Sequence, residues 1–127
     1  MKKSVILFIS FLVCLNVNFA TTFIVTNTND SGVNSLRQAI TDANASNGPH
    51  SIVFNIPTSD VNYDVNSGTW KITLATTLPM IIKPFITIDG SSQTTNQGNT
   101  NLLGPEIELS SNTLLTYAFR IVTPGNT

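Results

Sequence analysis

Hydrophobic and polar positions form three successive patterns along the chain. A continuous apolar run comes first, extending from Val5 to Leu15 with Ser10 as its one polar residue. A stripe at helical spacing follows, made of Leu36, Ala39, Ile40 and Ala43. The rest consists of short apolar segments separated by polar turn formers. This order predicts a single helix followed by strands.

The stripe predicts a helix over Leu36–Ala45. Ser35 and Gln38 have the spacing of a capping box, in which the serine hydroxyl accepts a free helix amide and the glutamine bonds back to the serine backbone. Asn47, Gly48 and Pro49 predict its end, because Asn and Gly tolerate a left-handed conformation and proline prevents continuation.

The later segments are rich in β-branched and aromatic residues, which favour strands. The predicted strands are Thr22–Thr26, Ser51–Ile56, Trp70–Ala75, Phe85–Asp89, Ile107–Ser110 and Phe119–Val122. Val61, Tyr63 and Val65 alternate with polar residues, and the Asn66–Gly68 turn predicts a hairpin between them and Trp70. Residues 90–104 are interpreted as a turn cluster.

The later strands are too far apart for a series of hairpins, whose loops have about 2–5 residues. No helical crossover pattern follows residue 50. We therefore expect a solenoid, in which the chain coils and each strand stacks on its counterpart one turn later. The abundance of threonine and asparagine suits stacked strands and turns.

Four segments resemble one family. They are TFIVTNTNDSGVNSLRQAITDAN (Thr22–Asn44), SIVFNIP (Ser51–Pro57), LPMIIKPFITIDGSSQ (Leu78–Gln93) and PEIELS (Pro105–Ser110). Together they resemble the N-terminal part of secreted bacterial right-handed parallel β-helix proteins of the pectin-lyase-like class. The resemblance implies a mainly β fold, with a cap made of a strand and one short helix, followed by the first coils of a truncated β-helix. Val61–Thr69 is an insertion relative to this pattern.

This resemblance sets the expected domain organisation. Residues 1–20 form a signal peptide, residues 21–69 form the cap with its helix and hairpin excursion, and residues 70–127 form incomplete opening coils. The cap is expected to use Ser35, Leu36, Gln38, Ala39, Ile40 and Ala43. Nothing after Val122 resembles a second cap, so we expect a fragment whose β-helix continues C-terminally.

The first twenty residues have the pattern of a secretory signal peptide. Lys2 and Lys3 precede the apolar run, and Ala20 precedes polar residues, which predicts a cut after Ala20. The run is shorter than the roughly 20 residues of a membrane span, although an uncleaved anchor remains an alternative. We expect a secreted or cell-surface protein with no membrane span after signal removal. Cys14 lies inside the run, so the mature chain has no disulfide.

Composition limits the classes of molecule that the chain is expected to bind. Charged residues make up 10% of the chain and the net charge is −1, which disfavours a nucleic-acid partner. The expected partner is a carbohydrate or a component of the cell surface. Phe23, Tyr63, Trp70 and Tyr117 are the aromatic candidates for stacking on a sugar.

Asp60, Asn62 and Asp64 alternate like the oxygen ligands of a calcium loop. The sixth position is Val65 where glycine is needed, and the twelfth is Lys71 where a glutamate belongs. Calcium at these residues stays an alternative, and we predict that the chain uses no cofactor.

Catalytic candidates are few. His50 is predicted to be a solvated loop residue, Glu106 and Glu108 to lie on one face of a strand, and Arg37 and Arg120 to have structural roles. The sequence therefore predicts no catalytic residues and a non-catalytic scaffold for surface adhesion or display. The alternative is the N-terminal part of a polysaccharide lyase or glycoside hydrolase whose active site lies on later coils.

Overall fold

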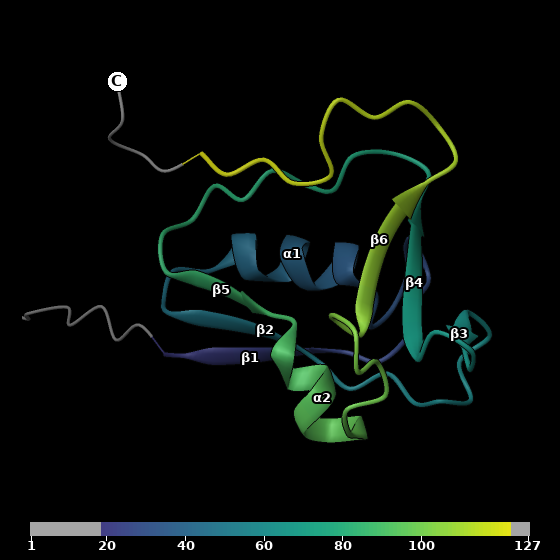
Figure 1. The fold of residues 1–127 in the computed structure, drawn as a ribbon. Helices are drawn as coiled ribbons and strands as arrows, with labels where there is room; N and C mark the ends of the chain where they lie inside the picture. Colours follow the sequence, from purple (N-terminus) through teal and green to yellow (C-terminus); the bar gives the residue numbers. More distant parts are fainter. Residues whose placement is uncertain (1–18, 123–127) are drawn as a thin grey trace, which may run out of the picture.

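A computed structural model describes residues 19–122, which form two three-stranded sheets and two helices (Figure 1). In chain order the elements are β1 (Thr21–Val25), α1 (Leu36–Ala45), β2 (His50–Phe54), β3 (Tyr63–Asp64), β4 (Thr69–Leu74), β5 (Ile86–Asp89), α2 (Ser91–Gln97) and β6 (Ile107–Ser111). The predicted signal peptide lies outside the described residues except for its last two positions.

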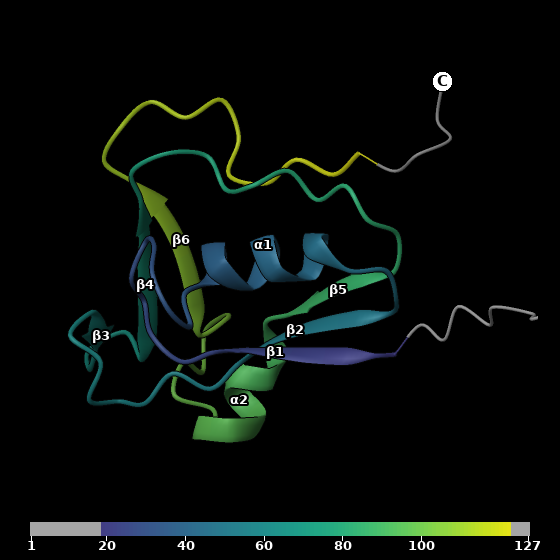
Figure 2. The same cartoon turned by 180° about the vertical axis from the view of Figure 1, so that it is seen from behind.

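The two sheets are built differently. The first is parallel throughout and has the order β1-β2-β5. The second has the order β3-β4-β6, in which β3 and β4 are the antiparallel arms of the predicted hairpin and β6 runs parallel to β4. Figures 1 and 2 show that the strands of one sheet run at a steep angle to those of the other.

The expectation of a right-handed parallel β-helix is wrong. Within residues 19–122 the strands form two separate open sheets, one of them mixed, and neither closes into a coil. Phe119–Val122, predicted as a strand, contributes only one parallel bridge, between Ile81 and Ile121. The connection from β5 to β6 contains a helix, which a uniform coil of strands would not have.

Helix α1 has the bounds that its apolar stripe predicts. Leu36, Ala39, Ile40 and Ala43 are buried, and the helix packs against β1 and β2. Ser35 caps its first turn, because the serine hydroxyl accepts the Gln38 amide at 3.2 Å. The second half of the predicted capping box is wrong. The exposed Gln38 side chain donates to Asp42 of the next turn instead.

The end of α1 also differs from the prediction. Ser46 at the C-cap is extended, with a φ of −128°, so the helix ends without a left-handed residue next to it. Gly48 has a φ of 150°, and the positive value belongs to the turn that enters β2.

The core lies where the inward faces of the central strands β2 and β4 meet α1. Ile52 and Phe54 of β2 and Ile72 and Leu74 of β4 are at most 2% exposed. Trp70 is fully buried, and its indole N–H donates to the Pro57 carbonyl at 3.0 Å. The core is therefore well packed around the two central strands.

Two polar side chains of α1 hold the loop that leads to β5. Arg37 donates to the carbonyls of Thr76 and Thr77 and forms an ion pair with Asp30 at 2.7 Å. Asn44 donates to the Met80 carbonyl and accepts the Ile82 amide, as a neighbouring strand would. These bonds fix the path of residues 76–82 along the helix.

Helix α2 was interpreted as a turn from the sequence, and its role is unusual. Gln93 is fully buried and forms two hydrogen bonds with the backbone of Ile56, accepting its N–H at 2.9 Å and donating to its carbonyl at 2.7 Å. Ser92 accepts the Phe54 amide at 2.7 Å. Polar side chains of α2 thus form hydrogen bonds with the backbone of Phe54 and Ile56, where a longer strand β5 would otherwise have paired.

Candidate functional site

The main candidate is an apolar hollow of about 380 Å³ beside the outer strand β5. We name it the open apolar end. Its lining consists of Ile81, Ile86, Ile88, Phe119 and Ile121. Ile86 and Ile88 come from β5, and Ile81 and Ile121 come from the bridged segments beside it. All five side chains lack a hydrogen-bonding group.

The strand register explains why this end is open. Ile88 of β5 is paired with Ile52 of β2, and Leu109 of β6 is paired with Ile72 of β4. The residues on the central strands are at most 1% exposed, whereas their partners on the outer strands are only partly buried. On the same face of each sheet, the residue of the central strand is therefore buried, whereas its partner on the outer strand is partly exposed.

The incomplete burial of the open apolar end makes the fold less stable than complete burial would. Complete burial of an isoleucine or phenylalanine side chain contributes about 1.5–3 kcal/mol relative to exposure. Ile121 is 68% exposed, and Ile86, Ile88 and Phe119 are partly buried. A surface that covered this end would thus contribute up to about that amount at Ile121 and a fraction of it at each of the other three, before the cost of association.

Phe85, directly before β5, is another exposed apolar residue. Its side chain is 77% exposed, and its φ is 62°. Such a value is rare for a bulky residue and is strained. The Phe85 carbonyl accepts the His50 amide at 2.9 Å, so the backbone is held in place by β2.

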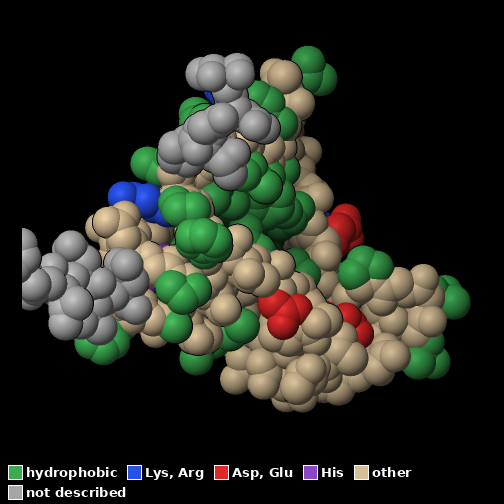
Figure 3. Space-filling view, turned by 90° about the vertical axis from the view of Figure 1, so that its left-hand side faces the viewer, with side chains coloured by type: hydrophobic (Ala, Val, Ile, Leu, Met, Phe, Trp, Pro, Cys, Tyr) green, Lys and Arg blue, Asp and Glu red, His purple; other side chains and the backbone are tan. Residues whose placement is uncertain are grey.

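Figure 3 shows how charge is distributed on this side of the molecule. Hydrophobic side chains gather near the centre of the face, with Lys and Arg side chains to their left and Asp and Glu side chains below and to their right. The apolar area thus lies between regions of opposite charge.

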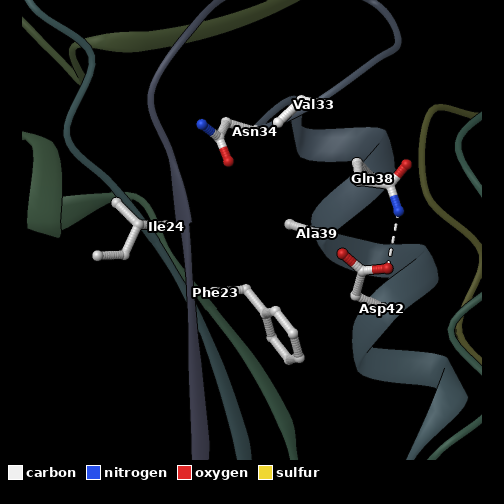
Figure 4. A pocket seen from close by; sticks show the side chains of 7 residues that line it. All are labelled: Phe23, Ile24, Val33, Asn34, Gln38, Ala39 and Asp42. Carbon is white, nitrogen blue, oxygen red and sulfur yellow. Dashed lines mark hydrogen bonds between the residues drawn. The ribbon is translucent and has the colours of Figure 1, made fainter.

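A second hollow, of about 390 Å³, lies between β1 and α1 (Figure 4). Phe23 points toward the helix, whereas Ile24 points to the other side of the strand. The polar groups in the hollow are largely paired with each other, since Gln38 donates to Asp42 at 2.7 Å. This arrangement offers no concentrated set of groups for chemistry.

His50 is not the solvated loop residue that the sequence suggested. It lies on β2 and is 2% exposed, with its ring edge-on to Phe23 at 5.6 Å. Its Nε2 is 3.0 Å from the Ser46 hydroxyl, and no described residue pairs with its Nδ1. A serine and a histidine therefore meet here, but no described carboxylate orients the imidazole as a catalytic triad requires.

The candidate calcium ligands Asp60, Asn62 and Asp64 each form hydrogen bonds within the protein. The Asp60 carboxylate accepts the backbone N–H and the hydroxyl of Thr28, and Asn62 donates to that same hydroxyl. The Asp64 carboxylate accepts the Asn66 amide at 2.9 Å, which lowers the pKa of Asp64 below its ordinary value of 3.8. Among residues 19–122 no group of three acidic, histidine or cysteine side chains could hold a metal ion.

The two glutamates do not form an exposed pair. Glu106 lies just before β6, is 5% exposed and accepts the Thr94 hydroxyl at 2.7 Å. Glu108 is exposed and forms an ion pair with Lys71 at 3.4 Å. Alternation along the strand therefore did not give them equal surroundings, and they do not resemble the facing carboxylates of a glycosidase.

The remaining candidates are also dispersed. Trp70 is fully buried and its ring centroid is 4.5 Å from that of Tyr63, so these two aromatic residues belong to the core and its margin. Phe23 contacts His50, and Tyr117 is 41% exposed. Arg120 is exposed, and its carbonyl accepts the Ile81 amide. The aromatic residues are thus spread over several elements rather than forming one flat platform.

Sequence reasoning missed the open apolar end. Ile86 and Ile88 were correctly placed on a strand, but nothing in their spacing distinguishes them from the buried Ile52 and Ile72. Phe85 was interpreted as an ordinary strand residue. The proline before it was the available signal, because Lys83-Pro84 predicted a turn at this point.

No helix among the described residues is long and apolar enough to cross a membrane. Comparisons with protein-family models, with curated proteins and with solved structures found no match. The functional assignment therefore depends on the geometry of the open apolar end and on the sequence of the first twenty residues.

Proposed function

We propose that this chain is an exported, non-catalytic interaction module that binds a protein partner through the open apolar end. The observation that carries the proposal is the difference in solvent exposure between paired residues on the same face of each sheet. Ile52 and Ile72 are at most 1% exposed, while their register partners Ile88 and Leu109 are only partly buried.

The lining of the hollow supports a protein partner over a carbohydrate. Sugars need hydrogen-bond donors and acceptors beside any apolar contact, and the five lining side chains have none. Apolar area with a charged margin is instead typical of protein interfaces. Display at the cell surface, one of the expectations from the sequence, is compatible with such a partner.

Export is supported by the sequence of residues 1–20 and by the first strand. The charged start, the apolar run and Ala20 have the order of a signal peptide. Strand β1 begins at Thr21, directly after the proposed cut. A fusion of the chain to a phosphatase that is active only outside the cytoplasm tests this proposal. We expect activity with the natural sequence and loss of activity with Leu12→Arg in the apolar run.

Binding through the open apolar end is tested with an environment-sensitive apolar dye in dilute solution. We expect the exported chain to bind the dye and Ile121→Ser to reduce the fluorescence several-fold. Ile24→Ser is the matched control, because Ile24 is 50% exposed but lies outside the open apolar end. Equal loss in both variants would show that the dye does not report on this surface.

The absence of catalysis is tested separately. The purified chain is incubated with pectin or alginate, and ultraviolet absorbance is followed for the carbon–carbon double bonds that a lyase forms. We expect no increase above the rate without protein. Product formation by the chain itself would overturn the non-catalytic assignment.

A further inference from the structure

The outer edge of β5 contributes to the lining of the open apolar end, and no other strand among residues 19–122 pairs with it. Parallel strands bond through alternate residues. The His50 amide donates to the Phe85 carbonyl, so Phe85 and Thr87 direct their backbone groups toward β2. Ile86 and Ile88 consequently direct theirs outward, and β5 is the last strand of its sheet.

Within its four residues β5 has no proline and no lysine, and its register with β2 is uninterrupted; Lys83 and Pro84 come shortly before it and Asp89 ends it. Natural edge strands are protected by proline, by lysine or by a bulge. The four residues of β5 are Ile86, Thr87, Ile88 and Asp89, and none of the first three is charged. The edge can therefore accept another strand along most of its length.

The sequence of β5 is complementary to itself in the antiparallel direction. With Thr87 opposite Thr87 of a second copy, Ile86 lies opposite Ile88 and Ile88 opposite Ile86. These isoleucine pairs are the ones with outward backbone groups, so each forms a hydrogen-bonded pair of the ladder. A shift by one residue would place isoleucine opposite threonine or aspartate and direct side chains to the wrong face.

Charge follows the same twofold relation. Lys83 comes three residues before Ile86, and Asp89 ends the strand. Antiparallel pairing brings the lysine end of one copy toward the aspartate end of the other.

We infer that the partner at the open apolar end is a second copy of this chain. The two copies pair β5 with β5 in antiparallel orientation about a twofold axis at Thr87, and each covers the Ile86 and Ile88 side chains of the other. Such a contact uses the same surface on both copies and closes at a dimer. The inference depends on the proposed function, because it names the partner of that surface.

Sedimentation equilibrium of the purified exported chain over a range of concentrations tests the dimer. Thr87 is exposed and lies opposite itself in the inferred pair, so Thr87→Asp places two carboxylates face to face. We expect Thr87→Asp to weaken dimerisation about tenfold, since like charges directly opposite each other destabilise a strand pair. The folded monomer is expected to keep its circular dichroism spectrum.

The chain offers a matched control and a rescue. Thr22, also exposed, occupies the same register position on β1 through Ser51, so Thr22→Asp makes the same change at the opposite edge of the sheet. We expect it to leave dimerisation unchanged. Thr87→Lys alone should also weaken self-association, and a mixture of Thr87→Asp with Thr87→Lys should form a mixed dimer.

Three results would overturn the dimer: a monomer at all concentrations, equal effects of Thr22→Asp and Thr87→Asp, or failure of the mixture to associate. Dye binding separates this failure from failure of the proposed function. A chain that stays monomeric but binds the dye at Ile121 has a different partner at the same surface. A chain that neither dimerises nor binds the dye would contradict both proposals.

Discussion

Phe85 combines an exposed aromatic ring with a left-handed backbone conformation. A left-handed conformation costs an L-residue roughly 1–2 kcal/mol, whereas glycine adopts it freely but loses more entropy on folding. Phe85→Gly should therefore raise the free energy of unfolding by about 0.5–1 kcal/mol, because little burial is lost at a side chain that is 77% exposed. Urea unfolding measures the change.

Asn34 is the matched control for Phe85. Its φ of 60° is nearly the same, but asparagine tolerates this region much better than phenylalanine. Asn34→Gly should leave the unfolding midpoint almost unchanged. If both substitutions stabilised the chain equally, the benefit would come from glycine in general and not from strain at Phe85. A Phe85→Gly chain that dimerises less would indicate that the aromatic ring contributes to the interface.

Asp64 makes the stability of the fold depend on pH in the acidic range. The Asn66 amide holds the pKa of this carboxylate below 3.8, so the ionised form is favoured in the folded state. A lowered pKa stabilises the fold fully above the unfolded value, and the contribution is lost as the pH falls through the folded value. We expect an NMR titration midpoint for Asp64 below 3.8. In Asp64→Asn this component of acid sensitivity should be absent.

At the scale of elements, α2 is the feature that depends most on single side chains. Gln93→Leu would leave the N–H and the carbonyl of Ile56 unpaired in a buried place. Because each unsatisfied buried group costs about 1–3 kcal/mol, we expect the free energy of unfolding to fall by roughly 2–6 kcal/mol. Chemical unfolding compares this variant with Gln97→Leu, whose side chain bonds only to the exposed Asn55 side chain. A similar loss in both variants would contradict the role of Gln93.

The two helices differ in how well the sequence predicts them. Helix α1 has an apolar stripe and a serine cap, so its bounds follow from local pattern. Helix α2 reads SSQTTNQ and has no apolar residue, which makes it indistinguishable from a polar turn cluster. Its formation depends on hydrogen bonds to Phe54 and Ile56, far away in the sequence, and no local rule reports such bonds.

Strands were easier to locate than to assemble. Alternation identifies β2, β4, β5 and β6 within a few residues, and the turn at Asn66–Gly68 identifies the hairpin of β3 and β4. Alternation does not state which strand lies beside which, because it defines a face and not a neighbour. The β-helix expectation came from assigning the strands after residue 70 to one coil, whereas β5 pairs with β2 in one sheet, β6 pairs with β4 in the other, and the polar helix α2 lies between β5 and β6 in the chain.

At the scale of the whole molecule, the candidate site could not be predicted for the same reason, because alternation does not state what lies next to each strand. Ile52, Ile72, Ile88 and Leu109 have equivalent places in their segments, yet two are sealed and two are partly exposed. The difference is set by what lies beyond each strand in space. The candidate ligand and catalytic residues Asp60, Asn62 and Glu106 each form hydrogen bonds with side chains of other segments.

If the open apolar end is covered by a second copy, the stability of the whole molecule depends on its concentration. Association stabilises the folded state by mass action, so a tenfold increase in chain concentration should add about 1.4 kcal/mol per dimer once dimers dominate. The melting temperature of the natural chain should therefore rise with concentration. Thr87→Asp should need about a tenfold higher concentration to reach the same melting temperature, while Thr22→Asp should follow the natural chain. Calorimetry measures all three, and a melting temperature of the natural chain that does not change with concentration would place another partner on this surface.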